Sequence, residues 1–560
     1  MKKLHSHWFI WLVLLIVSLL PLFDLFNSGL PITHDGKDHV ARIANFYQSF
    51  SEGNVVPRWA GNLNWGYGHP VMMFLYPLPS YIASAFHAIG FSFVDSVKLV
   101  FAFGFIASIF AMFLWVSAAW GTEAGITAAV LYGFAPYRFV DIYIRGAIGE
   151  HVAFIFLPFV MFGLYMLAKQ SFDAPNILIY RYMRIIKTEV VIALGVAGLI
   201  LSHNALSIMF LPIAGVYALY LFVYESKDKR RFFITSVICM TLGFILSAFF
   251  WIPAFVEGKY TLRDIVTVAD FKTRFVPLRW FLWSAWNYGG GNEFSKSLGV
   301  GQLLGLVLVL VKFSKANRKM QIFTISAISI LIVSLFLMTN AALPVWQSIS
   351  LLQKFQFPWR LMSVAVFATS IIGAIGISIV SKKEKIWMMG LLCTIAIVGT
   401  IPMWHAKEYV LMPDSNFTSV YNGTTDTGES SPIWSIRFME TKAKAPIEVI
   451  SGKDVSITIG RRNSTYHSYT VSSLSPVKLV ENTLYFPNWE VFVDKTRVPV
   501  EFQNPNYRGL LTFDVPAGVH DVEIIFSDTK LRTTANWISI GGIFILLGFL
   551  ATMRLWQKRR

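Results

Sequence analysis

Four residues near the N-terminus carry side chains that can do acid–base or ion-binding chemistry. They are Asp35, Asp38, His39 and Arg42, and they follow the first apolar segment of the chain. If a helix begins here, their i, i+3, i+4, i+7 spacing places them on one face. Two carboxylates, an imidazole and a guanidinium can together deprotonate a hydroxyl or hold a divalent cation. They also suit an ordinary helix start, because acidic residues in a first turn favour the helix dipole.

Other ionisable residues lie at the ends of later apolar segments. They are Arg145, Glu150 and His151 in YIRGAIGEH, His203 in LSHN, Glu257 and Lys259 in WIPAFVEGK, and Arg360 in FQFPWR. Charged groups in such places often only reach the membrane interface, and a histidine in a tight turn often only caps a helix. Arg360 fits a lipid phosphate and a headgroup anchor equally well. The aromatic and glycine-rich stretch 286–294 suits a sugar-stacking loop or a flexible one.

Several familiar catalytic motifs do not occur in the sequence. There is no Walker-type phosphate loop, no GxGxxG after a strand, no GxSxG and no HExxH. Their absence argues against a nucleotide-driven pump and against several hydrolase classes. The energy for any reaction would therefore have to arrive in the substrate.

Composition identifies the environment that must position these residues. The chain has 560 residues, 55% of them hydrophobic and 14% charged, with a mean hydropathy of +0.55. This is more apolar surface than a water-soluble core of this size can bury, which predicts a polytopic α-helical membrane protein. The net charge of +16 comes largely from basic residues in short segments between apolar ones, a positive-inside pattern and not a nucleic-acid footprint.

Apolar runs long enough to cross the bilayer predict about twelve transmembrane helices. The runs are 8–26, 98–118, 123–141, 151–168, 188–204, 205–224, 232–256, 298–313, 320–338, 359–381, 386–404 and 534–555. With the N-terminus inside, the basic segments and the C-terminal tail fall on the cytoplasmic side of a bacterial plasma membrane. The segments 27–97, 257–297, 339–358 and 405–533 then lie outside.

The outer segment before the last helix has a different character. Short alternating stretches such as VSITIG, WEVFVD and DVEIIF are separated by turn residues, which predicts a β-sandwich-like domain. We therefore expect three parts. They are a transmembrane module over 1–404 with a large first outer loop at 27–97, an extracytoplasmic β-rich domain over 405–533, and a final helix with a basic tail over 534–560.

The order of several strings resembles one bacterial membrane-protein family of the GT-C glycosyltransferase superfamily. This is the group labelled 6-pyruvoyl-tetrahydropterin-synthase-related, akin to the YfhO-like proteins. The strings are HDGKDH, PRWAGNLNWGYGHP, FLYPLPSY, YIRGAIGEH, LSHN, WIPAFVEG, FQFPWR, YFPNWEVFVDKTRVPVEF and VPAGVHDVEIIF. The resemblance covers nearly the whole chain, and nothing in these strings indicates pterin chemistry.

The resemblance implies an inverting transferase that moves a sugar from a polyprenyl-phosphate donor to a cell-envelope polymer, lipid or protein on the outer face. It implies Asp35 or Asp38 as catalytic base. It makes Arg58, Arg145, Lys259 and Arg360 candidates to stabilise the departing phosphate. The wider substrate-binding set adds His39, Glu150, His151, His203 and Glu257. The DxxD spacing differs from the DxD of metal-dependent members, so a divalent cation on Asp35 and Asp38 is left open.

Two other functions fit the same pattern. A transporter or flippase of lipid-linked glycans would place polar residues in mid-span, whereas here they gather at outer helix ends and in outer loops. A non-catalytic scaffold that binds glycans would not depend on the carboxylates of Asp35 and Asp38.

Overall fold

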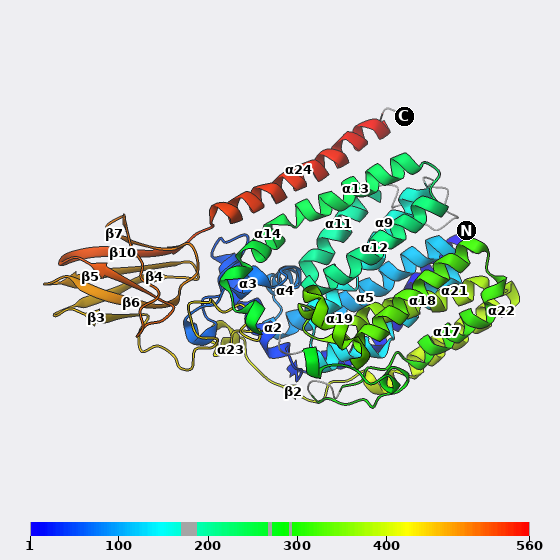
Figure 1. Cartoon of the computed structure of the whole chain (residues 1–560), viewed down its shortest axis with the longest axis horizontal. Coiled ribbons are helices and arrows are strands. Elements are labelled where there is room, and N and C mark those ends of the chain that lie inside the picture. The colour runs from blue at the N-terminus through cyan, green and yellow to red at the C-terminus, as the bar shows by residue number, and fades with distance from the viewer. Residues whose placement is uncertain (1, 170–187, 267–270, 290–293, 559–560) are drawn as a thin grey trace.

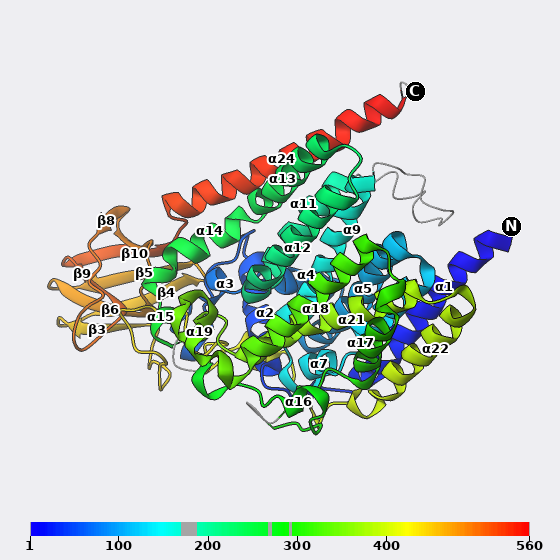
Figure 2. The ribbon, with the colours of Figure 1, turned by 45° about the vertical axis from the view of Figure 1, so that its right-hand side comes forward.

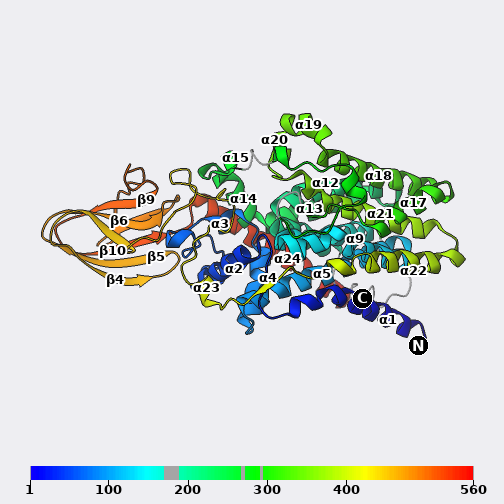
Figure 3. The ribbon, with the colours of Figure 1, turned by 90° about the horizontal axis from the view of Figure 1, so that it is seen from below.

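The computed structural model describes residues 2–169, 188–266, 271–289 and 294–558. The basic segment 170–187, residues 290–293 of the glycine-rich stretch and the last two arginines of the tail lie outside the described residues. A helical module forms the larger part of the molecule, and a β domain projects from one end of it (Figures 1 and 3). Both termini lie at the opposite end of the module.

Eight helical segments among the described residues are long and apolar enough to cross a membrane. They are Trp8–Phe26, Phe93–Trp120, Ile148–Lys169, Asn204–Tyr224, Arg318–Met338, Pro358–Ile379, Lys382–Met403 and Lys530–Leu550. A ninth would be the bent pair α13 (Lys229–Leu246) and α14 (Ala248–Val256), whose axes turn by 70°. The chain is therefore a membrane protein with about eight spanning helices.

The described residues do not confirm the predicted twelve. Each of the twelve apolar runs does contain a helix, but three of these helices are short. They are α6 (Thr122–Gly133), α11 (Thr188–Ser202) and α17 (Val300–Lys312). At 1.5 Å per residue, helices of 12 to 15 residues fall short of the ~30 Å hydrocarbon layer. A hydropathy profile gives the length of an apolar segment but not the residue at which a helix ends.

The outward faces of the helices carry large apolar side chains. Trp387 is 81% exposed, Val311 70% and Phe544 69%. A water-soluble protein rarely shows such a surface, whereas lipid tails cover it without cost. By contrast, α21 (Met362–Ile379) is buried on nearly all sides, so it lies at the centre of the module.

The module contains further long and short helices. The longer elements are α1 (Lys2–Leu19), α5 (Phe93–Trp120), α9 (Phe156–Lys169), α12 (Asn204–Tyr224), α18 (Arg318–Met338), α22 (Lys382–Val398) and α24 (Lys530–Lys558). The short ones are η1 (Leu20–Phe26), α7 (Pro136–Phe139), η3 (Val140–Arg145), α8 (Ile148–Ala153), η4 (Glu257–Tyr260), α15 (Arg263–Val266), η6 (Phe271–Thr273), α16 (Arg279–Leu282), η7 (Phe313–Lys315), η8 (Asn340–Ala342), α19 (Leu343–Ser348), α20 (Ser350–Gln353), η9 (Pro358–Leu361) and η10 (Ile401–Met403). Helix α24 runs alongside α13 and α14 (Figures 1 and 2).

The first outer loop folds into helices that lie between the module and the β domain. They are α2 (Gly36–Ser51), η2 (Asn64–Gly66), α3 (Val71–Phe74) and α4 (Leu78–Ala88). A short strand before α2, β1 (Leu30–Pro31), pairs with β2 (Tyr409–Val410). The loop is thus tied to a segment almost 380 residues further along the chain.

The β domain consists of two antiparallel sheets. One has the strand order β4-β5-β10-β7-β8 and the other β3-β6-β9. The strands are β3 (Ile447–Ser451), β4 (Ser456–Arg462), β5 (Tyr466–Ser473), β6 (Val477–Leu484), β7 (Trp489–Val493), β8 (Thr496–Val498), β9 (Leu510–Val515) and β10 (Gly518–Phe526). Alternating side chains such as Val471, Leu479 and Ile524 are fully buried in a common core, as period-2 strands require.

The chain between β2 and the sheets crosses the face of α2 before it enters the β domain. This segment, residues 413–432, contains the short helix α23 (Ser415–Thr418) and is called the strap below. Its backbone bonds to the first loop, with Asn64 N–H donating to Gly423 O at 2.8 Å and Tyr421 N–H to Asn62 O at 2.8 Å. The strap therefore closes over the residues that the sequence singles out.

Candidate functional site

Asp35 stands at the start of α2 without serving as its cap. Its side chain makes no capping hydrogen bond. The hydroxyl of Thr33 takes that place and accepts the N–H of Gly36 at 3.0 Å. The ordinary structural explanation of an acidic residue at a helix start is thereby removed.

The Asp35 carboxylate faces several charged groups without bonding to them. Solvent reaches its side chain, yet protein packs around it closely enough that burial raises its pKa. The positive charges of Arg145 and Arg42 oppose this rise in pKa, and that of His34 does so when protonated. Within the described part of the chain, no hydrogen bond or ion pair engages the carboxylate. Its backbone is fixed, because Asp35 N–H donates to Arg145 O at 2.9 Å.

The other three residues of the cluster lie against the strap. Asp38 accepts a hydrogen bond from the Tyr421 hydroxyl at 2.8 Å. Arg42 is buried and donates to the hydroxyl and the carbonyl of Thr425. His39 contacts Arg42 at 3.3 Å, and burial together with that guanidinium lowers the pKa of His39 well below its usual range. His39 is thus neutral at physiological pH, while Asp38 and Arg42 hold the strap in place.

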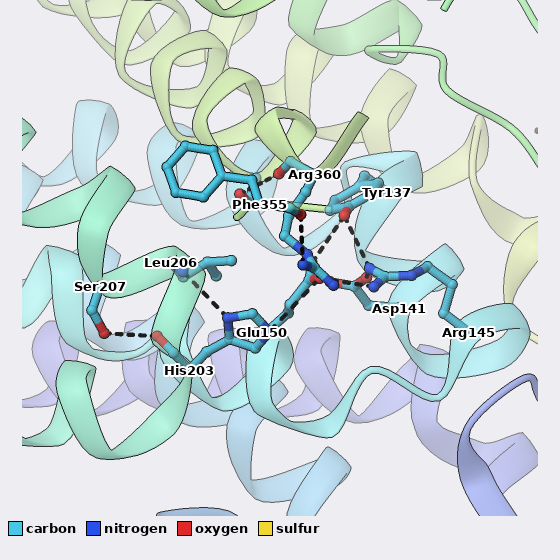
Figure 4. A network of polar contacts seen from close by, with 10 residues as sticks. Tyr137, Asp141, Arg145, Glu150, His203, Leu206, Ser207, Phe355 and Arg360 are labelled. Atoms are coloured by element: carbon cyan, nitrogen blue, oxygen red, sulfur yellow. Dashed lines mark hydrogen bonds and ion pairs between the residues drawn. The ribbon is translucent and has the colours of Figure 1, made fainter. Parts of the chain in front are cut away.

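Glu150 forms the centre of a second cluster, in which every member but the partly buried Arg360 is buried. Its carboxylate accepts from Arg145 Nη2 at 2.8 Å and from Arg360 Nε at 2.7 Å, and the Tyr137 hydroxyl donates to it at 2.9 Å. Arg145 also donates to Asp141 at 2.7 Å. Figure 4 shows these side chains converging from α7, η3, α8 and η9. The two arginines face two carboxylates, so the predicted charges of this cluster largely satisfy one another.

His203 caps a helix and also faces Glu150. Its Nδ1 accepts the N–H of Leu206 at 3.2 Å, which leaves the proton on Nε2. That nitrogen lies 3.9 Å from the Glu150 carboxylate (Figure 4). Its ring stacks on Tyr76, with 4.9 Å between centroids. The capping interpretation of the sequence therefore holds, and the same ring belongs to the Glu150 cluster.

The remaining predicted residues lie elsewhere. His151 points away from Glu150 and contacts the Phe101 carbonyl at 3.1 Å. Arg58 pairs with Asp528 at 2.9 Å, and Glu257 pairs with Arg532 at 2.8 Å. These two ion pairs join the first loop and η4 to the start of α24.

Lys259 is exposed and lies over its neighbour Tyr260 at 5.0 Å from the ring centroid. Among the described residues, no hydrogen bond or ion pair links Arg58, Glu257 or Lys259 to Asp35. They fit an architectural role at the junction with α24 and at the surface.

Sequence reasoning missed the residues that complete both clusters. Tyr421 and Thr425 of the strap lie in the segment that the sequence predicts as the β domain. Tyr137 and Tyr76 carry no charge that would mark them as candidates. Two glycines are the sequence feature that could have indicated these contacts. A Cβ on Gly149 would lie 2.1 Å from the Tyr76 ring, and one on Gly146 would lie 2.4 Å from the Thr33 hydroxyl. Both glycines of GAIGEH thus mark places where the first loop packs directly on η3 and α8.

Comparison with known proteins gives weak likenesses. No family model matches the chain. An uncharacterised protein of Lactococcus lactis subsp. cremoris is 26% identical over 282 residues, 49% of this chain and 43% of that protein. The chain thus spans less than half the length of this relative.

Solved structures to which the chain is similar at low TM-score include three proteins. Arabinofuranosyltransferase AftD from Mycobacteria has a TM-score of 0.44 at 15% identity over 71% of this chain and 27% of its own. The Archaeoglobus fulgidus oligosaccharyltransferase has a TM-score of 0.41 at 13% identity over 76% and 56%. ArnT from Cupriavidus metallidurans has a TM-score of 0.33 at 14% identity over 73% and 67%.

The site offers few ligands for a metal ion. Among the described residues, no group of three or more His, Cys, Asp or Glu side chains could hold one together. Asp35 and Asp38 offer two carboxylates at most, and Asp38 already accepts from Tyr421. A hard cation bound here would take its other ligands from water and from substrate phosphate, as Mg²⁺ commonly does.

Proposed function

We propose that this protein is a glycosyltransferase of the GT-C type. It transfers a sugar from a polyprenyl-phosphate donor to a cell-envelope acceptor on the outer face of a bacterial plasma membrane, with both termini cytoplasmic. Asp35 acts as the base. The membrane-crossing helices, the order of the sequence strings and the chemistry of the α2 start support this proposal.

The observation that carries the proposal is the unused carboxylate of Asp35. Every other acidic residue named in the two clusters, namely Asp38, Asp141 and Glu150, accepts a hydrogen bond or ion pair from a neighbour. Asp35 is held by its backbone and reached by solvent, and its carboxylate bonds to no residue that the structure describes. A fixed, unbonded carboxylate of raised pKa is what proton abstraction requires.

The reaction would proceed as a single displacement. The Asp35 carboxylate takes the proton of an acceptor hydroxyl while that oxygen attacks the anomeric carbon. The bond from this carbon to the phosphate oxygen breaks, and polyprenyl phosphate leaves with the bonding electrons, so the configuration inverts. Arg145 and Arg42 keep their bonds to Glu150, Asp141 and Thr425, but both lie close enough to Asp35 to oppose the rise in its pKa. Their positive charge would therefore favour a phosphate beside Asp35.

The test compares two neighbouring aspartates. Purified protein in nanodiscs receives a panel of radiolabelled polyprenyl-phosphate sugars and cell-envelope acceptors, and transfer is measured for wild type, Asp35→Asn and Asp38→Asn. We expect Asp35→Asn to lose about 10²- to 10⁴-fold in rate, the usual contribution of a general base. Asp38→Asn should lose far less, because its carboxylate serves the strap.

Two results would contradict the proposal. Full transfer by Asp35→Asn would remove its role as base. A wild-type protein that moves donors between leaflets without transferring sugar would support a flippase, and one that only binds glycans would support a scaffold.

A further inference from the structure

A polar cavity lies between the first outer loop and the β domain. It has a volume of about 130 Å³ and is lined by residues of both parts, among them Gln48, Trp59, Asn62, Tyr67 and Arg462. A single water needs ~10–15 Å³ by this measure, so the cavity holds on the order of ten waters or one sugar ring. Its mouth lies at Arg462, whose side chain is 27% exposed.

The cavity presents hydrogen-bonding groups that the fold leaves unused. The Tyr67 residue is only 8% exposed, and its hydroxyl bonds to no residue that the structure describes. Arg462 uses only Nη1 for its bonds to Glu481 and Tyr469, which leaves Nε and Nη2 without partners in the same set of residues. Such groups are available to bond a ligand or ordered water that enters the cavity.

The cavity approaches the Trp59 indole because residue 68 is glycine. Gly68 has φ +77°, and a Cβ there would lie 2.4 Å from Trp59 Nε1. Any side chain at this position would displace the indole. The PRWAGNLNWGYGHP string thus shapes one wall of the cavity.

The charges around the cavity favour a neutral occupant. Glu481 is buried and accepts from Arg462, and His467 lies 2.8 Å from it. Glu52 accepts from Ser464 N–H at 2.9 Å. Burial raises the pKa of Tyr67, and the nearby Glu448 carboxylate adds to this rise. One guanidinium against three carboxylates disfavours an anion such as a phosphate. Indole, phenol, amide and guanidinium donors suit a ligand rich in hydroxyl groups.

The cavity is joined to the start of α2. Gln48 and Asp38 lie on the same helix, ten residues apart, which is about 15 Å along its axis. Asn62 of the cavity wall accepts the N–H of Tyr421, whose hydroxyl binds Asp38. The distance along α2 corresponds to a chain of a few sugar units, one of which occupies the cavity.

We infer that this cavity binds a sugar unit of a neutral oligosaccharide acceptor and so sets the distance from the bound unit to the reacting hydroxyl. The acceptor role rests on the proposed function, whereas binding of the oligosaccharide does not.

The experiment measures binding and transfer separately. Saturation-transfer NMR on the full chain in nanodiscs is run with neutral linear tetrasaccharides of glucose, galactose, mannose and N-acetylglucosamine, and with inorganic phosphate as the anionic probe. We expect at least one tetrasaccharide to bind and phosphate not to compete.

Variants then locate the binding. Tyr67→Phe removes only the unused hydroxyl and should weaken binding roughly three- to tenfold. Gly61→Leu should abolish binding, because Gly61 lines the cavity and a Cβ there meets only Ser464, at 3.4 Å or more, so a longer side chain can enter the space. Tyr466→Phe is the matched control, since that hydroxyl bonds to Glu523 outside the cavity.

Binding without transfer would support the inference and count against the proposed function. Transfer with equal oligosaccharide binding in wild type, Tyr67→Phe and Gly61→Leu would overturn the inference alone. No binding of any tetrasaccharide to wild type would leave a water-filled cavity and also overturn it.

Discussion

Asp35 and Glu150 are both acidic residues at the start of a helix, α2 and α8 respectively, and they differ in the bonds that their carboxylates make. Glu150 is 1% exposed and bonds to two arginines and a tyrosine. Asp35 has no such partner among the described residues, and solvent reaches it. The difference indicates two roles. A carboxylate that bonds to several neighbours holds elements of the fold together, whereas a fixed carboxylate without a bonded partner can accept a proton.

The largest effect on stability is expected for a substitution of Glu150. Replacing Glu150 by Gln leaves Arg145 and Arg360 buried beside a neutral amide, so we expect a loss of about 3–5 kcal/mol in the free energy of unfolding. Unfolding in detergent, followed by tryptophan fluorescence, measures the loss. Equal stability of wild type and variant would show that the cluster does not hold η9 against α8.

Two controls give this result its meaning. Glu440→Gln alters an exposed acid and should change stability by less than about 0.5 kcal/mol. Asp35→Asn should likewise not destabilise the protein, because no partner loses a bond. A strong destabilisation by Asp35→Asn would assign Asp35 to the same class as Glu150.

A smaller effect is expected where the two regions touch. Gly146 has φ +67°, and a Cβ there would lie 2.4 Å from the Thr33 hydroxyl and 3.1 Å from the Gly36 nitrogen. Gly146→Ala should therefore cost about 1–3 kcal/mol and also lower transfer, because it displaces the turn that carries Asp35. Stability and transfer are measured on the same preparation.

The matched control for Gly146 is Gly53, at the other end of α2. Gly53 also has positive φ, +104°, but nothing lies within 4 Å of its added Cβ. Gly53→Ala should lose stability through backbone strain while transfer per folded molecule stays unchanged. Equal losses of transfer in both variants would mean that close packing on Asp35 is not the cause.

The sequence predicted the parts of the molecule that depend on local pattern. Each predicted apolar run contains a helix, and alternation predicted strands in the β domain. The spacing of Asp35, Asp38, His39 and Arg42 grouped them correctly near α2, although Asp35 precedes the helix and His39 and Arg42 face inward.

The missed features depend on contacts between distant segments. The strap bonds to the first loop through backbone groups more than 350 residues apart, and such bonds leave no trace in composition. Arg58 was predicted to bind phosphate and Glu257 to bind substrate, because their actual partners, Asp528 and Arg532, are several hundred residues away. Charge at a helix end shows that a partner is needed, and only the fold shows which one it has.

The smallest expected effect is the dependence of transfer on pH. Burial raises the pKa of the Asp35 carboxyl above its usual range near ~3.9. Because the base must be ionised, kcat/KM for transfer should fall as pH drops through the raised pKa of Asp35. Near neutral pH, kcat/KM should not change with pH. His34, the nearest other titrating side chain, has a pKa lowered by burial, so His34→Gln is measured alongside. An acid limb that disappears in His34→Gln would assign the titration to the imidazole. One that persists there, with a midpoint above that of an ordinary aspartate, belongs to the carboxylate that the fold leaves unbonded.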